Sequence, residues 1–78
     1  RFGEEYAHFL RLMGRLRPLV LALGRPSDEN AALFRRLAGS RLLEALGAAD
    51  GVLARSELTA LLPPELHDRI TELLDGAA

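Results

Sequence analysis

The sequence predicts an all-α fold, a compact bundle of five to six short helices, on three observations. Leucine and other apolar residues recur at helical spacings along nearly the whole chain. Alternating runs of β-branched residues, which would indicate strands, are missing. Glycine, proline and capping residues interrupt the apolar stripes every 8 to 14 residues or so, roughly one helix length. Helices this short are marginal alone in water, so we expect them to stabilise one another by packing.

The first helix begins at the N-terminus with an apolar stripe. Its residues are separated by alternating steps of four and three positions, which places them on one face of a helix: Phe2, Tyr6, Phe9, Met13 and Leu16. Gly14 and Pro18 interrupt this stripe. Because proline lacks an amide donor and clashes with the preceding turn, we expect a kink or a restart near residues 15–18. The helix then continues to Gly24, a residue suited to a C-terminal cap. The bundle has five helices if this helix is kinked and six if it is split.

Two helices are expected in the middle of the chain. Ser27 is a candidate N-cap, with Asp28 and Glu29 in the first turn, where the helix dipole favours negative charge, and Gly39 ends this helix. Ser40 caps the next, which ends at Gly47. Their buried stripes consist of Leu33, Phe34 and Leu37 in the first helix and of Leu42, Leu43 and Leu46 in the second.

Two further helices complete the chain. Asp50-Gly51 is typical of a turn, and Ser56 is expected to open a helix that runs to Leu62. Pro63-Pro64 ends it, and a proline at the first helical position is well placed to start the last helix. That helix ends at Gly76, and its stripe is formed by Leu66, Ile70, Leu73 and Leu74.

Length and composition limit the function. The 78 residues allow one domain, and we expect residues 1–78 to form a single helical interaction domain. Because the sequence starts with Arg1, we expect it to belong to a longer protein. A net charge of −1 argues against nucleic-acid binding, which needs a basic excess. The longest apolar run, residues 19–23, is far shorter than the roughly 20 residues that span a membrane. With no cysteine present, a cytoplasmic location is expected.

The charges are distributed unevenly between the two halves of the chain. Residues 1–40 contain seven arginines and four acidic residues, a net charge of +3, whereas residues 41–78 contain three arginines and seven acidic residues, a net charge of −4. We predict two interaction surfaces: a basic patch of Arg11, Arg15, Arg17, Arg35 and Arg36, and an acidic patch of Glu57, Glu65, Asp68, Glu72 and Asp75. Such surfaces suit head-to-tail association with copies or relatives of the domain. The alternative is that these charged residues only form the ordinary solvent-exposed faces of a helical bundle and bind no partner.

Catalytic and metal-binding patterns are missing, so no enzymatic activity, cofactor or metal is expected. His8 and His67 are far apart in sequence and have no second ligand at helical spacing. Helix capping accounts for the three serines named above, and neither a nucleophile elbow nor a phosphate-binding loop occurs. Residues 46–57 have the glycine and terminal glutamate of a calcium loop, but Leu46 and Ala48 stand where oxygen ligands are required.

Residues 40–75 resemble the death-fold superfamily, in particular the caspase recruitment domains. The similarity includes a leucine-rich helix, a Gly-Val-Leu turn, a glutamate in the next short helix and a final Leu-Leu-Asp. The matching residues are Leu42, Leu43, Leu46, Gly51, Val52, Leu53, Glu57, Leu58, Ile70, Leu73, Leu74 and Asp75. The segment Leu-Arg-Pro-Leu-Val at 16–20 is similar to the kinked first helix of that family, whereas residues 25–39 add a helix between the two matching parts.

This resemblance implies a six-helix adaptor that acts by homotypic interaction through charged surface patches. In bacteria such domains resemble parts of antiviral cell-suicide systems, so it implies a partner that is a similar helical domain. A second resemblance, to TerB-like helical domains, rests on the Ala-Asp-Gly turn at 49–51 followed by a glutamate-containing helix.

Two alternatives remain. The chain can be a structural helical subdomain of a larger enzyme or phage protein, which predicts an exposed apolar stripe at Phe2, Tyr6, Phe9 and Met13. The second alternative is a helix-turn-helix nucleic-acid binder. Only the arginines near residues 11–17 and 35–41 favour it, and the acidic residues of the last helices argue against it.

Overall fold

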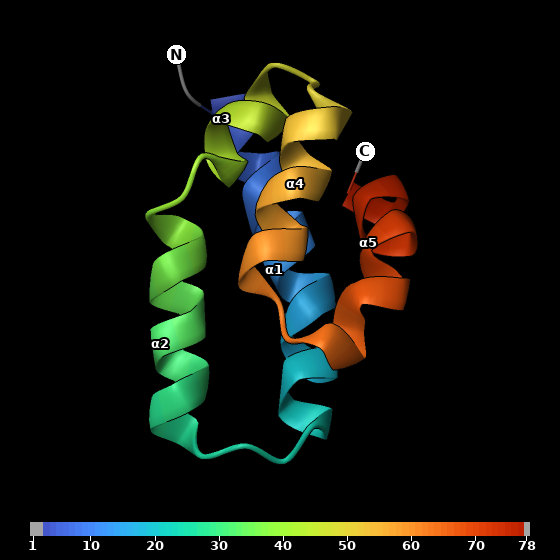
Figure 1. Ribbon diagram of the computed structural model, residues 1–78. Helices are drawn as coiled ribbons and strands as arrows, with labels where there is room; N and C mark the ends of the chain where they lie inside the picture. The colour runs from blue at the N-terminus through green and yellow to red at the C-terminus, as the bar shows by residue number, and fades with distance from the viewer. Residues whose placement is uncertain (1–2, 78) are drawn as a thin grey trace.

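The computed structural model describes the backbone of residues 3–77 and the side chains of residues 6–75. This part of the chain is all-α, as predicted, and contains no strand. The elements in chain order are α1 (Gly3–Ala22), α2 (Ser27–Ala38), α3 (Leu42–Gly47), α4 (Gly51–Leu61), the 3-10 helix η1 (Pro64–Arg69) and α5 (Ile70–Ala77) (Figure 1). Phe2, the first residue of the expected N-terminal stripe, lies outside the described residues.

The first helix is a single element, so of the two predicted possibilities near residues 15–18, a kink or a restart, the restart is wrong. α1 is continuous over 20 residues, with Pro18 inside it. Gly14 and Pro18 are exposed, whereas Leu12 and Leu16 are completely buried on the opposite face. The apolar face of α1 is buried both before and after Pro18 in the chain. Packing of this face therefore keeps the helix continuous, although proline lacks the amide donor. The bundle therefore has five α-helices within residues 3–77.

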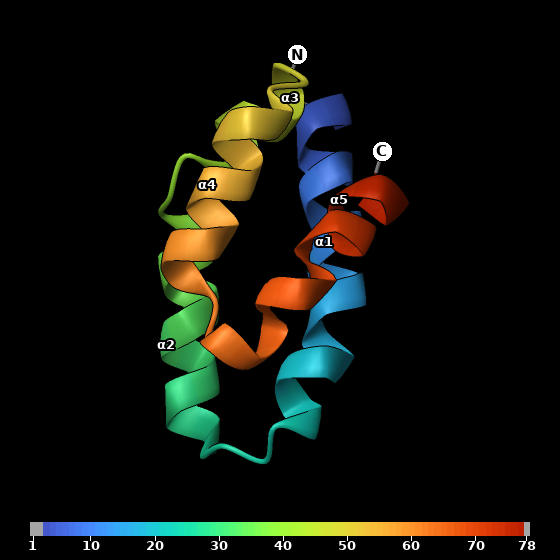
Figure 2. The same cartoon turned by 45° about the vertical axis from the view of Figure 1, so that its right-hand side comes forward.

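The core lies between α1, α3, α4 and α5. α1 packs against α3 on one side and α5 on the other, and α4 packs against both α3 and α5. Figure 2 shows α5 lying against α1. Most of the fully buried side chains are leucines, and the largest are Leu12, Leu16, Val20, Leu37, Leu42, Leu58, Ile70 and Leu73. Helical spacing within each element places these residues on one face.

Helix α2 stands to one side of this core (Figure 1). It packs mainly against α3 and α4 and buries Asn30, Leu33 and Leu37. A turn at Gly24 connects it to α1, and the φ of +73° at Gly24 is the left-handed conformation expected of a glycine C-cap. At the other end of α2, the amide of Gly39 bonds to the carbonyl of Arg35, as the predicted stop requires.

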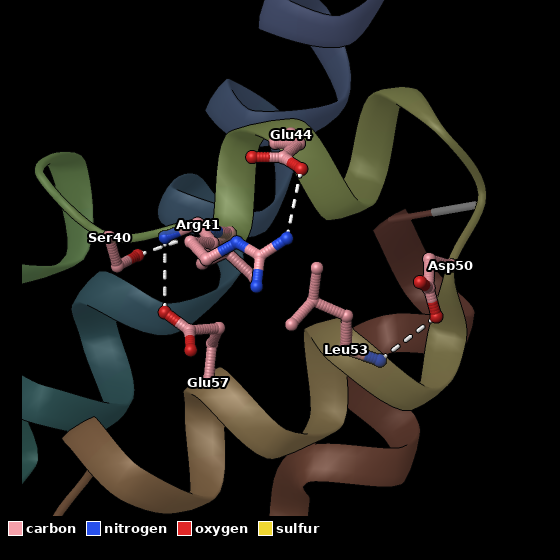
Figure 3. Close-up of polar contacts among 7 residues, drawn as sticks. Ser40, Arg41, Glu44, Asp50, Leu53 and Glu57 are labelled. Carbon is pink, nitrogen blue, oxygen red and sulfur yellow. Dashed lines mark hydrogen bonds and ion pairs between the residues drawn. The ribbon is translucent and has the colours of Figure 1, made fainter.

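The helix starts agree only partly with the predicted caps. Ser40 accepts a hydrogen bond from the amide of Leu42 (3.1 Å), the first residue of α3, but the N-cap position itself is Arg41, one residue later than predicted. Ser27 makes no capping bond. Ser56 lies inside α4, whose N-cap is Asp50: its carboxylate accepts from the amide of Leu53 (3.0 Å) (Figure 3). The Asp-Gly pair is therefore a helix start, and α4 begins five residues earlier than predicted.

The C-terminal segment begins as a 3-10 helix. Pro64 occupies the first position of η1, as predicted, and the chain passes directly from Arg69 into α5. The predicted stop at Gly76 falls one residue early, because α5 extends to Ala77. None of the helices in the described residues has the length and apolar character needed to cross a membrane.

Candidate functional site

An apolar strip lies exposed on the outer side of α1. Tyr6, Leu10 and Leu21 are 49%, 51% and 56% exposed, and steps of four and eleven residues place them on one side of the helix. Gly14 lies on the same side with open space above it. We call Tyr6, Leu10 and Leu21 the α1 apolar face. It differs from the predicted exposed stripe, because Phe9 is buried in the core and Met13 is half-buried.

Arg17 connects this face to α2. Its guanidinium carbon lies 4.8 Å from the centre of the Phe34 ring, within the range of a cation–π contact. Arg17 is exposed and makes no ion pair within the described side chains. The contact leaves its positive charge available at the surface between α1 and α2.

The other residues of the predicted basic patch have different surroundings. Arg11 and Arg35 are exposed and form no ion pair with any side chain between residues 6 and 75. Arg36 lines a cavity between α2 and the end of α4. Arg15 is exposed and forms no ion pair among the described side chains, and its charge contributes to lowering the pKa of Glu72 on α5.

The predicted acidic patch is partly neutralised by arginines of the same molecule. Glu65 pairs with Arg25 (2.9 Å), and Glu72 pairs with Arg69 through two hydrogen bonds of 2.9 and 3.1 Å. Hydrogen bonds from Arg69 lower the pKa of Glu72, and Arg69 and Arg15 add electrostatic stabilisation of the carboxylate.

Glu57 has a structural role in the same acidic patch. Its carboxylate accepts a hydrogen bond of 3.0 Å from the backbone amide of Arg41, at the start of α3, and so joins α4 to α3 (Figure 3). Asp68 and Asp75 are exposed and form no ion pair within the described side chains. These two aspartates are therefore the carboxylates of the patch that remain available to a partner.

The fold thus brings part of the two charged patches together. The charge of Arg15 in the first half acts on Glu72 in the second, and Arg25, which is outside the predicted basic patch, forms an ion pair with Glu65. Exposed ion pairs of this kind contribute little stability, since water and salt screen them, but they remove charge from the available surface. In the two predicted patches, the charged residues that form no ion pair among the described side chains, apart from Glu57, are Arg11, Arg15, Arg17, Arg35 and Arg36 on α1 and α2, and Asp68 and Asp75 on η1 and α5.

A cavity of about 290 Å³ opens between α2, the end of α1 and the end of α4. Asn30 lines it and is the one buried polar residue among the described side chains, at 9% exposed. Its carboxamide makes no hydrogen bond within the described residues, and its polar atoms keep contact with the cavity. Arg25, Glu29 and Arg36 lie at the rim.

The sequence arguments missed Asn30 and, on the α1 apolar face, Leu10 and Leu21, whereas Tyr6 belonged to the predicted exposed stripe and is exposed. Asn30, Leu33 and Leu37 have i, i+3, i+7 spacing, so a polar residue on a buried stripe was the available signal. For Leu10 and Leu21 the available signal was their position on α1: both lie beside the buried apolar stripe rather than within it, which indicates that they are exposed.

Neither histidine belongs to a metal site among the described residues, where no group of three or more metal-ligating side chains occurs. His8 is half-buried at the edge of an apolar cavity of about 200 Å³ between α1, α3, α4 and α5. The Nε2 atom of His67 lies 2.9 Å from the carbonyl oxygen of Leu62, which fixes the turn into η1. Both histidines therefore lie at the boundary of the core.

Comparison of the chain with protein-family models, with curated proteins and with solved structures finds no match in any of the three. The functional argument therefore depends on the surfaces described above.

Proposed function

We propose that the chain is a non-enzymatic protein–protein interaction module, an adaptor of the death-fold-like kind that recruits or assembles with a similar helical domain. The observation that carries this proposal is the α1 apolar face, where Tyr6, Leu10 and Leu21 are about half exposed on a single helix. Apolar residues gathered on one side of a helix, beside uncompensated charge, are typical of protein-binding surfaces.

The charges beside this face indicate an acidic partner. Arg11, Arg17 and Arg35 have no ion pair within the described side chains, so their positive charge is free to attract carboxylates. A similar domain would offer such carboxylates at the positions of Asp68 and Asp75. Charge attraction orients and accelerates this contact, and burial of the apolar side chains supplies most of its affinity.

The resemblance of residues 40–75 to caspase recruitment domains supports the same function. It also suggests the setting, which is the assembly of effectors in bacterial antiviral defence within the cytoplasm. A partner gene encoding a protease or a pore-forming protein beside the gene for this chain would support that setting.

To test the proposal, light scattering measures the average mass of the assemblies as the concentration of the domain rises. Leu21→Asp places a carboxylate on the α1 apolar face, and we expect it to weaken association at least about tenfold. Ala22→Asp is the matched control, because it adds the same charge one residue away, at an exposed position on another side of α1. Equal loss in both variants, or no loss in either, contradicts the proposal. So does a wild-type domain that stays monomeric at its highest soluble concentration.

A second candidate function is supported by the same exposed residues. As a structural subdomain of a larger protein, the chain would cover Tyr6, Leu10 and Leu21 with another part of that protein. In that case the separate domain self-associates without saturation, and Arg17→Glu has no effect, because the contact does not depend on charge. Loss of association in Arg17→Glu supports the adaptor function instead.

A further inference from the structure

The Asn30 cavity has the features of a small receptor site. Its walls combine apolar side chains with the polar side chains of Arg25, Glu29, Asn30 and Arg36; the apolar ones are Val20, Leu23, Ala32, Leu33, Leu61, Leu62 and Pro63. Asn30 adds a carboxamide, which offers one acceptor oxygen and two donor hydrogens to an occupant. The polar atoms of Asn30 have no partner among the described side chains but stay accessible through the cavity, so an occupant with a hydrogen-bonding group can take the place of the water there. The volume suits one or two small side chains with their peptide groups rather than a large cofactor.

The opposite end of the molecule carries a projection. Residues 48–52, the α3–α4 turn, are all exposed, and Ala49 has a φ of +54°. Val52 is 83% exposed, more than any other large hydrophobic residue of the described chain. Figure 1 shows that this turn lies at the end of the bundle where α4 begins, whereas the cavity lies where α4 ends. One molecule therefore has an apolar projection at one end and an apolar cavity at the other.

We infer that the α3–α4 turn of a second copy of this chain inserts into the Asn30 cavity. Val52 and Ala49 are small enough to enter, and the apolar walls would cover the valine. The amides of Gly51 and Val52 stand at the start of α4 and make no hydrogen bond in the structure, whereas Asp50 already satisfies the amides of Leu53 and Ala54. The oxygen of the Asn30 carboxamide would accept from one of these two free amides.

The charges around the two surfaces are complementary. Arg36 and Glu29 lie at the cavity rim, while Arg25 there is already paired with Glu65. Asp50 caps the projecting turn. On its flank, a shallow hollow beside Val52 is lined by Arg55 and Asp75, among others. Arg36 can therefore face Asp50 or Asp75, and Glu29 can face Arg55.

Such a contact joins two different surfaces, so every copy keeps a free turn at one end and a free cavity at the other. Contacts of this heterologous kind extend into open chains unless the rotation between copies closes a ring. The inference rests on the proposed function to the extent that the partner is a copy of this domain. It uses surfaces other than the α1 apolar face.

The test uses two variants that each disable one side of the contact. Val52→Lys replaces the inserted valine with a cation, and Ala32→Phe fills the cavity from α2. Sedimentation velocity of each variant alone should show association weakened at least about tenfold relative to the wild type. With Leu21→Asp added to both variants to remove the α1 contact, a 1:1 mixture should form a dimer and stop there, because it contains one intact turn, on the Ala32→Phe chain, and one intact cavity, on the Val52→Lys chain. Circular dichroism confirms that each variant is folded.

Three results would overturn the inference. The first is association of Val52→Lys that is as strong as that of the wild type. The second is a mixture that remains monomeric, and the third is a mixture that forms long assemblies as the wild type does. Leu21→Asp separates this inference from the proposed function. If only the α1 contact exists, Leu21→Asp abolishes association and Val52→Lys does not. If only the turn and cavity bind each other, the reverse holds.

Discussion

Replacement of Asn30 by leucine should stabilise the domain. The carboxamide is nine-tenths buried without an intramolecular partner among the described residues, so its removal relieves an unfavourable burial of about 1 kcal/mol. We use the low end of the usual range because the polar atoms still reach the cavity. Leucine also has a higher helix propensity than asparagine, by about 0.5 kcal/mol. The expected gain in the free energy of unfolding is therefore about 1–2 kcal/mol.

This gain is large for a domain of this size. A chain of 78 residues has a total free energy of unfolding of about 4–12 kcal/mol. In a domain of this length each kcal/mol shifts the thermal midpoint by about 4–8 °C, so Asn30→Leu should raise it by roughly 5–15 °C. Thermal unfolding followed by circular dichroism at 222 nm, a standard wavelength for helix content, measures this shift.

Asn30→Ala is the control for Asn30→Leu. Alanine shares the gain in helix propensity but leaves the site unfilled, so its midpoint should lie between those of the wild type and Asn30→Leu. A fall in the midpoint of Asn30→Leu would refute the reasoning, because it would mean that the carboxamide is satisfied inside the folded chain. A more stable Asn30→Leu variant that no longer associates would show that stability is given up at this position for binding.

Three further predictions concern stability. Leu58→Ala removes a completely buried side chain from α4 and should lower the free energy of unfolding by about 3–5 kcal/mol, measured by urea denaturation. Asp50→Ala removes the cap that accepts from the amide of Leu53 and should cost about 1 kcal/mol in the same assay. The pKa of Glu72 lies below its usual value of 4.5, because of hydrogen bonds from Arg69, so its ion pair stabilises the fold above that value and is lost as the pH falls through the lowered pKa. Glu72→Gln should therefore make stability less dependent on pH in this acidic range, which urea titrations at a series of pH values measure.

Each of these predictions has a control or a contradicting result. Leu58→Met keeps the volume of the side chain and should cost much less than Leu58→Ala. Asp50→Asn keeps an acceptor oxygen, so a loss as large as that of Asp50→Ala would mean that the cap does not stabilise α4 through its hydrogen bond. An unchanged pH dependence in Glu72→Gln would show that the pair with Arg69 is not formed in solution.

The helical class of the fold was predictable because leucine spacing reflects burial directly. The ends of α1 and α2 were also predictable, since Gly24 and Gly39 combine a helix stop with the end of an apolar stripe. The continuity through Pro18 was not, because local proline chemistry opposes it and only the buried residues on the far side of α1 maintain it. The start of α4 was missed for a related reason: Asp-Gly suits both a turn and an N-cap, and the two are distinguished by the packing of the residues that follow.

The candidate surfaces were less predictable than the fold. Arg25 and Glu65 are 40 residues apart in the sequence, and nothing in their local pattern indicates that they form an ion pair. Helix periodicity assigns a residue to a face of its own helix, but it does not say which face another helix covers. Asn30 could have been placed on a buried stripe from its spacing to Leu33 and Leu37. The cavity beside it depends on how α2 packs against α4, which no single helix specifies.

The most direct test of the interaction function is a residue-by-residue map of the contact. Amide and side-chain signals of the ¹⁵N-labelled domain are followed by NMR as unlabelled domain is added. The account predicts changes at the amides of Leu10 and Leu21 for the α1 contact, and at the Asn30 side-chain amide and the amide of Val52 for the turn and cavity. Spectra that do not change with concentration, or changes confined to other parts of the surface, would contradict it.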